Sequence, residues 1–466
     1  MRWAGRPLSA LAVGVALGAP AWFDAAQSAR LTTLVSSQRV YADAETIANR
    51  FGPRVTATPA YEHALDWAAD EFRAAGVKSV AVEPFQIPRG WERGPASARI
   101  VAADFDRTTA GPREIRVEAL GWTAATPGDA LEADVVRLAD LAPASLTAAR
   151  VKGRIVFVES EKNAERGAEK TARRRSTDDV LADAGAAAIL LPSRDDDFAV
   201  RPWQFGGQVS RLPIFEVERD DASVLRGLLQ RGRVRMAIDS RNRTSAGPVS
   251  TRSLVAEIAG SEHPDEWVLV GAHLDSWDLA AGAQDNATGA AMVLEAARAI
   301  AAFGRPPRRS IRFALWGAEE EGFLGSTAYA RAHESEMDRA VAVLNADAGT
   351  GRIIGWTAPG RDDVASAVRR TVSPLLAAVG SGDVDTSMRY AFDSDHAPFM
   401  QLGVPALDLN ADDTHYEEIH HTAADTMDRV DAKNLTAGAV TVAVTAYAIA
   451  DVPERIAPHR KIQRVR

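Results

Sequence analysis

The segment WVLVGAHLDSWD, residues 267–278, joins a continuous apolar run to a group of polar side chains. The run WVLVG (267–271) is typical of a strand buried on both faces, which lacks the alternation of a half-exposed strand. Three further apolar runs lie at 311–316, 340–344 and 404–409. The alanine-rich stretch 288–303, between the first two runs, is typical of a helix. This alternation predicts an α/β fold with a central, mostly parallel sheet flanked by helices.

Polar side chains capable of binding a metal follow these runs where the predicted strands end. In open α/β sheets, ligands bind beyond the carboxyl ends of the strands, so we expect these side chains to converge. Asp285 lies in the loop before the helix at 288–303, and His421 follows the fourth run. The complete candidate set is His273, Asp275, Asp285, Glu319, Glu320, Asp347 and His421.

The chemistry of this set favours a centre with two metal ions. The chain has no cysteine, so any metal must be held by histidine, aspartate and glutamate. Two zinc ions roughly 3.5–4 Å apart fit such a site. Each ion would take one histidine and one terminal carboxylate, and the two ions would share a carboxylate and a water. Cobalt and manganese also suit these ligands.

The adjacent pair Glu319 and Glu320 needs a division of labour. Neighbours in an extended chain point in different directions, so one can bind metal while the other faces the water. A free carboxylate beside such a water can take its proton and pass it to the leaving amine. Asp275, two residues after His273, is placed to hold the imidazole from behind.

Other polar residues near these motifs have ordinary explanations as well. Glu321 extends the acidic pair and is compatible with a solvated surface, and His420 is interpreted as a neighbour of the ligand His421. Asp395 and His396, in the polar stretch 393–396, are candidates for substrate binding, and His415 is a weaker one.

Composition limits the class of partner and the compartment. The net charge of -9 argues against nucleic acid as a partner. Residues 1–21 resemble an export signal, with a positive start, an apolar stretch at 8–19 and a small-residue cleavage site. That stretch is shorter than the roughly 20 residues that span a bilayer. We therefore expect a secreted or periplasmic protein without stable membrane insertion.

The length of 466 residues predicts more than one domain. Residues 119–247 contain short β runs but no histidine, and we expect them to form a small inserted domain. The catalytic domain would then comprise 31–118 and 248–455. A basic tail at 456–466 is expected to be poorly ordered.

The motifs resemble those of the M28 family of zinc peptidases. The matching segments are GAHLDS (271–276), GAQDNATG (282–289), LWGAEEEGFLGS (315–326), NAD (345–347) and HT (421–422). The resemblance implies a central mixed sheet flanked by helices. It also implies two Zn²⁺ per chain: His273 and Asp347 would hold one ion, Glu320 and His421 the other, and Asp285 would bridge them.

The same resemblance assigns the remaining roles. Glu319 would be the general base and acid for a water that bridges the metals, and Asp275 would orient His273. SWD (276–278) and HH (420–421) resemble the carboxypeptidase Q branch of the family, and 119–247 resembles a protease-associated (PA) domain. The implied substrates are dipeptides or short peptides with a free amino terminus. A homodimer is compatible with the sequence.

The sequence leaves several activities open. Aminopeptidase, dipeptidase and carboxypeptidase action all fit the motifs. A non-catalytic binding protein on the same fold is one alternative, although such a protein would be expected to have lost the base or the ligands. A single-zinc enzyme that cyclises amino-terminal glutamine is another, and metal stoichiometry separates it from a two-metal peptidase.

Overall fold

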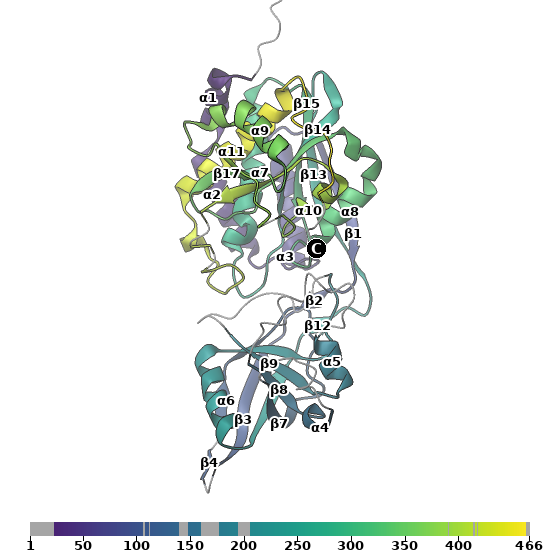
Figure 1. Cartoon of the computed structure of the whole chain (residues 1–466), viewed down its shortest axis with the longest axis vertical. Helices are drawn as coiled ribbons and strands as arrows, with labels where there is room; N and C mark the ends of the chain where they lie inside the picture. Colours follow the sequence, from purple (N-terminus) through teal and green to yellow (C-terminus); the bar gives the residue numbers. More distant parts are fainter. Residues whose placement is uncertain are drawn as a thin grey trace, which may run out of the picture.

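The computed structural model describes residues 23–105, 108–110, 112–138, 148–159, 177–193, 206–389, 391–412, 415–416 and 418–462. The expected export signal at 1–21 lies outside these ranges. The molecule has a larger and a smaller lobe, stacked along its long axis, with the short strands β2 (Trp91–Glu92) and β12 (Arg243–Thr244) between them (Figure 1).

An eight-stranded mixed sheet forms the centre of the larger lobe. Its strand order is β1-β13-β15-β14-β16-β19-β17-β18. The strands are β1 (Ser79–Ile87), β13 (Val249–Ile258), β14 (His263–His273), β15 (Arg309–Trp316), β16 (Ala340–Asn345), β17 (Ile353–Thr357), β18 (Asp383–Asp385) and β19 (Ala406–Ala411). The four central strands β15, β14, β16 and β19 run parallel, whereas β1 and β13 add antiparallel at one edge. The predicted mostly parallel mixed sheet is confirmed.

Helices cover both faces of this sheet. The helices of the lobe are α1 (Ala25–Leu34), α2 (Ser37–Glu45), α3 (Pro59–Ala74), α7 (Thr288–Phe303), α8 (Leu324–Ala332), α9 (Asp362–Thr371), α10 (Ala397–Leu402) and α11 (Ala432–Asp451). Short π and 3₁₀ turns are η1 (Thr46–Phe51), η4 (Ala283–Ala287), η5 (Glu334–Arg339), η6 (Ser373–Leu376) and η7 (Met427–Arg429).

The central strand β14 shows why its sequence is apolar throughout. Val268 and Val270 belong to the core shared with α7 and α11, whereas Trp267 and Leu269 belong to the core shared with α8 and α10. Successive side chains of a strand point to opposite faces, and here both faces are covered. Among the described helices, none combines the length and the apolar character needed to span a bilayer.

The smaller lobe is built on a nine-stranded sheet. Its strands are β3 (Ala96–Phe105), β4 (Thr108–Ala110), β5 (Arg113–Ile115), β6 (Val117–Ala119), β7 (Leu131–Leu138), β8 (Ile155–Val158), β9 (Ala188–Pro192), β10 (Ile214–Val217) and β11 (Val234–Ser240). Its helices are α4 (Ala148–Val151), α5 (Thr177–Asp183) and α6 (Arg219–Arg231). Strand β3 pairs with β4, β5 and β11, and β6 pairs with β10, whereas the expected boundary at 118/119 lies within β6 and places β3 to β5 with the catalytic domain. By sheet membership, the inserted part would run from about Ala96 to Ser240.

The chain after α11 lies against the larger lobe as far as it is described. His459 Nε2 is 2.7 Å from the Ala340 carbonyl oxygen, and the Arg361 guanidinium donates to the Pro458 carbonyl over 2.7 Å. These contacts attach residues 458 and 459 to the larger lobe, and the order of the whole tail stays a prediction. Carbonyl contacts of this kind leave no signature in composition, which is why the basic tail looked unattached.

Candidate active site

The candidate side chains gather at the carboxyl edge of the central strands. The contributing segments are the loops after β14 (His273, Asp275), after β15 (Glu319, Glu320), after β16 (Asp347) and after β19 (His421), and the turn η4 (Asp285). Adjacent parallel strands end at the same edge, so loops distant in sequence meet there. All seven residues are buried or partly buried.

Asp285 lies between the two histidines. Its Oδ1 is 3.1 Å from His273 Nε2, and its Oδ2 is 3.2 Å from His421 Nε2. Each imidazole has a second carboxylate beside it. Asp347 Oδ1 is 3.4 Å from His273 Nε2, and Glu320 Oε2 is 3.0 Å from His421 Nε2. The arrangement has one carboxylate in the centre and a histidine–carboxylate pair on each side.

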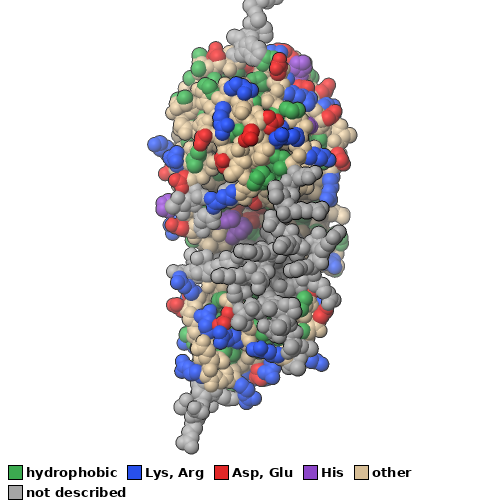
Figure 2. Space-filling model, viewed as in Figure 1, with side chains coloured by type: hydrophobic (Ala, Val, Ile, Leu, Met, Phe, Trp, Pro, Cys, Tyr) green, Lys and Arg blue, Asp and Glu red, His purple; other side chains and the backbone are tan. Residues whose placement is uncertain are grey.

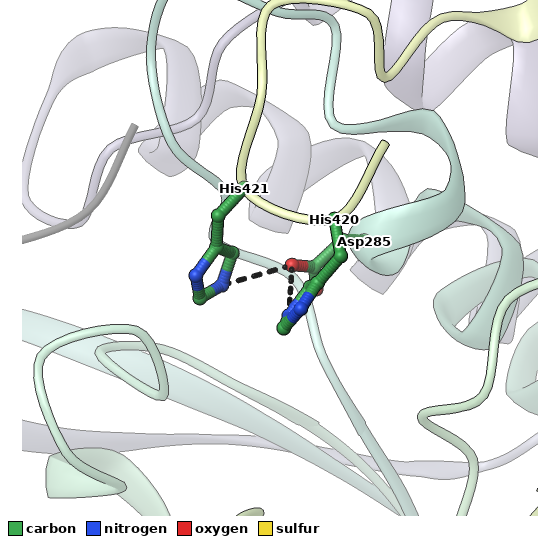
Figure 3. A group of neighbouring side chains, drawn as sticks. All are labelled: Asp285, His420 and His421. Carbon is green, nitrogen blue, oxygen red and sulfur yellow. Dashed lines mark ion pairs between the residues drawn. The ribbon is translucent and has the colours of Figure 1, made fainter. Parts of the chain in front are cut away.

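His420 also reaches this centre. Its Nε2 lies 3.6 Å from Asp285 Oδ2, and both His420 and His421 point at that carboxylate (Figure 3). The ring stacks on Tyr416 with 4.9 Å between centroids. The side chain is 39% exposed, against 28% for His421, so His420 stands on the solvent side of the centre. Sequence reasoning placed it only as a neighbour of the ligand.

The donor atoms fit divalent metal ions. Two groups of side chains have ligand atoms within 4.8 Å of one another: His273 with Asp285 and Asp347, and Asp285 with His420 and His421. His273 Nε2 is buried and makes no contact of hydrogen-bond geometry among the described residues. A buried ring nitrogen of this kind, surrounded by carboxylate oxygens, is a typical metal ligand.

The electrostatics of the centre also require positive charge. Burial raises the pKa of Glu320 to about 7, and the neighbouring Asp285 carboxylate contributes to this rise. Burial acts to raise the pKa of Asp285 as well, but the imidazoles of His273 and His421 outweigh it and hold that pKa well below its ordinary value. Carboxylates this close cannot all stay ionised in a buried site unless cations compensate them.

Glu319 and Glu321 flank Glu320 and are buried with it. Burial raises the pKa of Glu319 well above its ordinary value, and Asp347 adds to this against the opposing effect of His273. Glu321 is 1% exposed, so its interpretation as a solvated residue is wrong. A glutamate held in such surroundings has a raised proton affinity, as a general base requires.

Asp275 contacts His273 differently from the expected arrangement. The closest contact of His273 Nδ1 is the backbone carbonyl of Asp275 at 3.0 Å, whereas the Asp275 carboxylate lies 3.7 Å away. The two carboxylate oxygens accept the backbone N–H groups of Glu319 and Glu320, each over 3.3 Å. Asp275 thus ties the loop after β14 to the loop after β15.

Arg54 also connects loops of the site, and sequence reasoning missed this residue. Its side chain is completely buried, and its guanidinium donates to the carbonyl oxygens of Leu274 at 2.8 Å, Ala281 at 2.9 Å and Gly282 at 2.9 Å. Burial lowers the pKa of Arg54 to about 10, while nearby carboxylates including Asp425 oppose the shift, so the group stays charged at neutral pH. One cation therefore holds the loops that carry His273 and Asp285.

Two further contacts shape the turn that carries Asp285. The Asp425 carboxylate accepts the backbone N–H groups of Gln284 at 2.7 Å and Asp285 at 3.1 Å. Asn286 donates through Nδ2 to the Ala346 carbonyl at 2.9 Å. A Cβ at Gly289 would lie 2.0 Å from that same carbonyl oxygen, so only glycine allows α7 to begin this close to the loop carrying Asp347.

Three further residues were candidates for the pocket, and Asp395 is an electrostatic neighbour of His273 and Asp347. Asp395 and His396 are 1% and 0% exposed, as deeply buried as His273, and their role in substrate binding stays a prediction. Their neighbour Ser394 donates to Asp347 Oδ2 over 2.7 Å, and this bond leaves Oδ1 directed at His273. His415 points into solvent, with 89% of its side chain exposed.

A small cavity opens beside the centre. Its volume is about 10 Å³, and its lining includes Trp277, Asp285, Glu320 and His421. Pockets for drug-sized ligands are larger, on the order of 300–1,000 Å³. Histidine side chains reach the surface near the level at which the two lobes meet, whereas Lys and Arg mix with Asp and Glu over this face (Figure 2).

Comparison with known proteins agrees with this geometry. A family model described as peptidase family M28 matches residues 253–446. Carboxypeptidase Q of Rattus norvegicus is 30% identical over 87% of this chain and 84% of its own, and aminopeptidase YwaD of Bacillus subtilis is 25% identical over 88% and 84%. The crystal structure of a peptidase M28 precursor from Shewanella amazonensis aligns with a TM-score of 0.79 and 28% identity, over 94% of this chain and 99% of that one.

The central strands of the α/β sheet end in histidines and carboxylates, and peptidases match most of the chain. Together these features define an enzyme of the metallopeptidase class. The chain belongs to peptidase family M28, and its relatives include carboxypeptidase Q and aminopeptidases. Its activity is the hydrolysis of peptide bonds.

Proposed function

We propose that this protein is a two-zinc exopeptidase that cleaves dipeptides or short peptides with a free amino terminus. One observation carries the proposal: the two oxygens of Asp285 face different histidines, at 3.1 Å and 3.2 Å. A carboxylate with this placement suits a bridge between two ions. His273 and Asp347 would complete one site, and His421 and Glu320 the other.

The donor set of imidazole nitrogens and carboxylate oxygens supports zinc as the metal. When bound, a pair of such ions supplies Lewis acidity: it polarises the scissile carbonyl and lowers the pKa of the attacking water. The loops that carry His273, Asp285 and Glu320 are fixed beforehand by Arg54 and by the Asp275 and Asp425 carboxylates, so little reorganisation of these loops would be needed on binding.

Glu319 would carry the proton during the reaction. Its carboxylate would accept a proton from the attacking water and then donate that proton to the departing amine nitrogen. Asp275 would hold Glu319 in place through the backbone N–H contact of 3.3 Å. The buried surroundings that raise the pKa of Glu319 favour this shuttling role.

The relatives of this chain support cleavage at the ends of peptides. Carboxypeptidase Q and aminopeptidase YwaD are both named as enzymes that act at chain ends. A panel of dipeptides and longer peptides, with free and blocked amino ends, tests this part of the proposal. Cleavage within blocked long peptides would contradict it.

Metal stoichiometry of matched histidine variants tests the ligand set. We expect two zinc ions per chain in the wild type by elemental analysis. His421→Ala should lose close to one equivalent, whereas His420→Ala should keep both, because His420 stands on the exposed side of the centre. If His420→Ala loses an ion and His421→Ala does not, the assignment of the second site is wrong. A single ion in the wild type would favour the glutamine-cyclising alternative.

A further inference from the structure

Trp277 holds one oxygen of the Glu320 carboxylate. Its indole Nε1–H donates to Glu320 Oε2 over 2.5 Å, and the same oxygen lies 3.0 Å from His421 Nε2. Trp277 is 3% exposed and Glu320 is 4% exposed. A hydrogen bond to an ionised acceptor is strong, and burial removes the water that would compete for it. The bond therefore fixes the rotation of the carboxylate beside His421.

Trp277 is held in turn by the smaller lobe. Trp122, in the chain between β6 and β7, is completely buried, and its ring meets Trp277 edge-on with 5.9 Å between centroids. Trp91 stacks on Trp122 at 5.6 Å. Both of these indoles have a fixed orientation, because Trp91 donates to the Thr123 carbonyl and Trp122 to the Arg89 carbonyl. The three rings form one apolar cluster at the junction of the lobes.

Two polar contacts reinforce this junction next to the site. The Arg93 guanidinium donates to both oxygens of Asp278, the residue after Trp277, over 2.6 Å and 2.8 Å. The backbone N–H of Gly206 donates to the carbonyl of Glu321, the residue after Glu320, over 2.5 Å. The smaller lobe and the segment around β2 therefore contact both the loop after β14 and the loop after β15, which the Trp277–Glu320 hydrogen bond connects.

We propose that the smaller lobe is a structural part of the metal centre, because Trp122 holds Trp277 and Trp277 holds the Glu320 carboxylate. The proposal rests on the proposed role of Glu320 as a metal ligand. Trp122 and Trp277 act through Glu320, so they are positioning residues. Their removal should speed the escape of the ion that Glu320 helps to hold and leave the ion at His273 and Asp347 in place.

The first test compares two matched variants of the zinc-loaded full chain. Trp277→Phe removes the N–H donor and keeps a ring against Trp122. Trp356→Phe is the control. Trp356 is also buried, and its indole N–H donates to the side-chain oxygen of Thr445, which lies away from the site. Zinc release to a chromogenic chelator is followed with time. We expect one of the two ions to leave about 10–100 times faster in Trp277→Phe, the usual effect of losing a contact to a metal ligand.

The second test asks whether Trp122 acts through Trp277. Trp122→Ala should release one zinc ion faster, and Trp122→Phe should largely restore the wild-type rate because an aromatic ring still supports Trp277. Because both residues act through Glu320, the zinc release rate of the double variant Trp122→Ala with Trp277→Phe should increase by less than the product of the two single increases. Circular dichroism at the assay temperature confirms that each variant is folded.

The outcomes separate this inference from the proposed function. If the wild type binds no zinc, the proposed function fails. If the wild type holds two ions and Trp277→Phe releases them no faster than Trp356→Phe, the role of Trp277 is wrong and the proposed function stands. If Trp277→Phe releases zinc faster but Trp122→Ala releases it at the wild-type rate, the contribution of the smaller lobe is refuted.

Discussion

Glu319 is the side chain whose removal separates metal binding from chemistry. It lies outside the proposed ligand set, so Glu319→Gln should keep both zinc ions and preserve the fold. Loss of proton transfer should lower kcat by about 10²–10⁴-fold. Steady-state kinetics with elemental analysis of the same sample checks this. Near-wild-type turnover in a fully metallated variant would remove Glu319 from the proposed mechanism.

Arg54 gives a second prediction at the scale of single residues. Arg54→Lys keeps a positive charge but cannot span the carbonyl oxygens of Leu274, Ala281 and Gly282 at once. We expect metal affinity to fall about 10–100-fold, measured by competition with a chelator.

The control for Arg54 is another buried arginine of the same lobe. Arg309 is 3% exposed and donates to the Pro453 carbonyl over 2.8 Å, far along the chain from any candidate ligand. Arg309→Lys should lower stability and leave metal affinity unchanged. Equal metal affinities in the two variants would show that Arg54 supports the fold and not the site.

The residues that sequence reasoning found are those whose chemistry is visible in their type. Histidines and acids at strand ends predicted the cluster around Asp285, and distances of 3.0–3.4 Å now link its members. Arg54 was missed because its partners are backbone carbonyls, which carry no residue signature. Asp395 and His396 are buried to the same degree as His273, and their predicted role in substrate binding stays a prediction.

At the scale of elements, helix α9 offers a prediction about pH. Arg361, at its start, is 2% exposed and donates to both oxygens of Asp363, each over 2.9 Å. This guanidinium holds the pKa of Asp363 down at about 2, against about 3.9 for an unfolded chain. The stability that the pair contributes is therefore complete above about pH 4 and is lost as the pH falls towards 2.

Comparison of the wild type with Asp363→Asn isolates this contribution. The difference in urea midpoint should be largest at pH 6 and should shrink by pH 3, because the Asp363 carboxylate of the unfolded chain takes up a proton in that range while that of the folded chain is still ionised. The acid titration of the metal site affects both proteins equally and cancels. A difference that grows on acidification would contradict the sign of the shift.

The elements themselves were predicted unevenly. The strand WVLVG and its neighbours carry continuous apolar runs, and β14, β15, β16 and β19 appear where those runs lie. The strands at 96–119 join the sheet of the smaller lobe, a pairing that was not predicted because β pairing between distant segments leaves no local signal. Their partners β10 and β11 lie more than 90 residues further along the chain, as their bounds show.

At the scale of the whole molecule, metal removal should act on one lobe. The loops around Asp285 join the ends of β14, β15 and β16, so two bound ions would cross-link the larger sheet. Each ion at a free concentration of 100 times its Kd would stabilise the folded state by about 2.7 kcal/mol. Chelation should therefore lower the melting temperature of the larger lobe by roughly 5–10 °C per ion.

Hydrogen exchange resolves this effect by region. Amides of α7 and β14 should lose protection in chelator, whereas those of β8 and β9, in the core of the smaller lobe, should change little. Uniform loosening of both lobes would argue that metal binding stabilises the junction as well. No change anywhere would contradict a metal cross-link at the strand ends.

The central claim is that one carboxylate, Asp285, lies between two metal ions. The most direct measurement is crystallography of the zinc-loaded protein with anomalous scattering at the zinc edge. The account predicts two anomalous peaks roughly 3.5–4 Å apart, with one Asp285 oxygen on each. A single peak, or two peaks of which one has no Asp285 oxygen as a ligand, would contradict it.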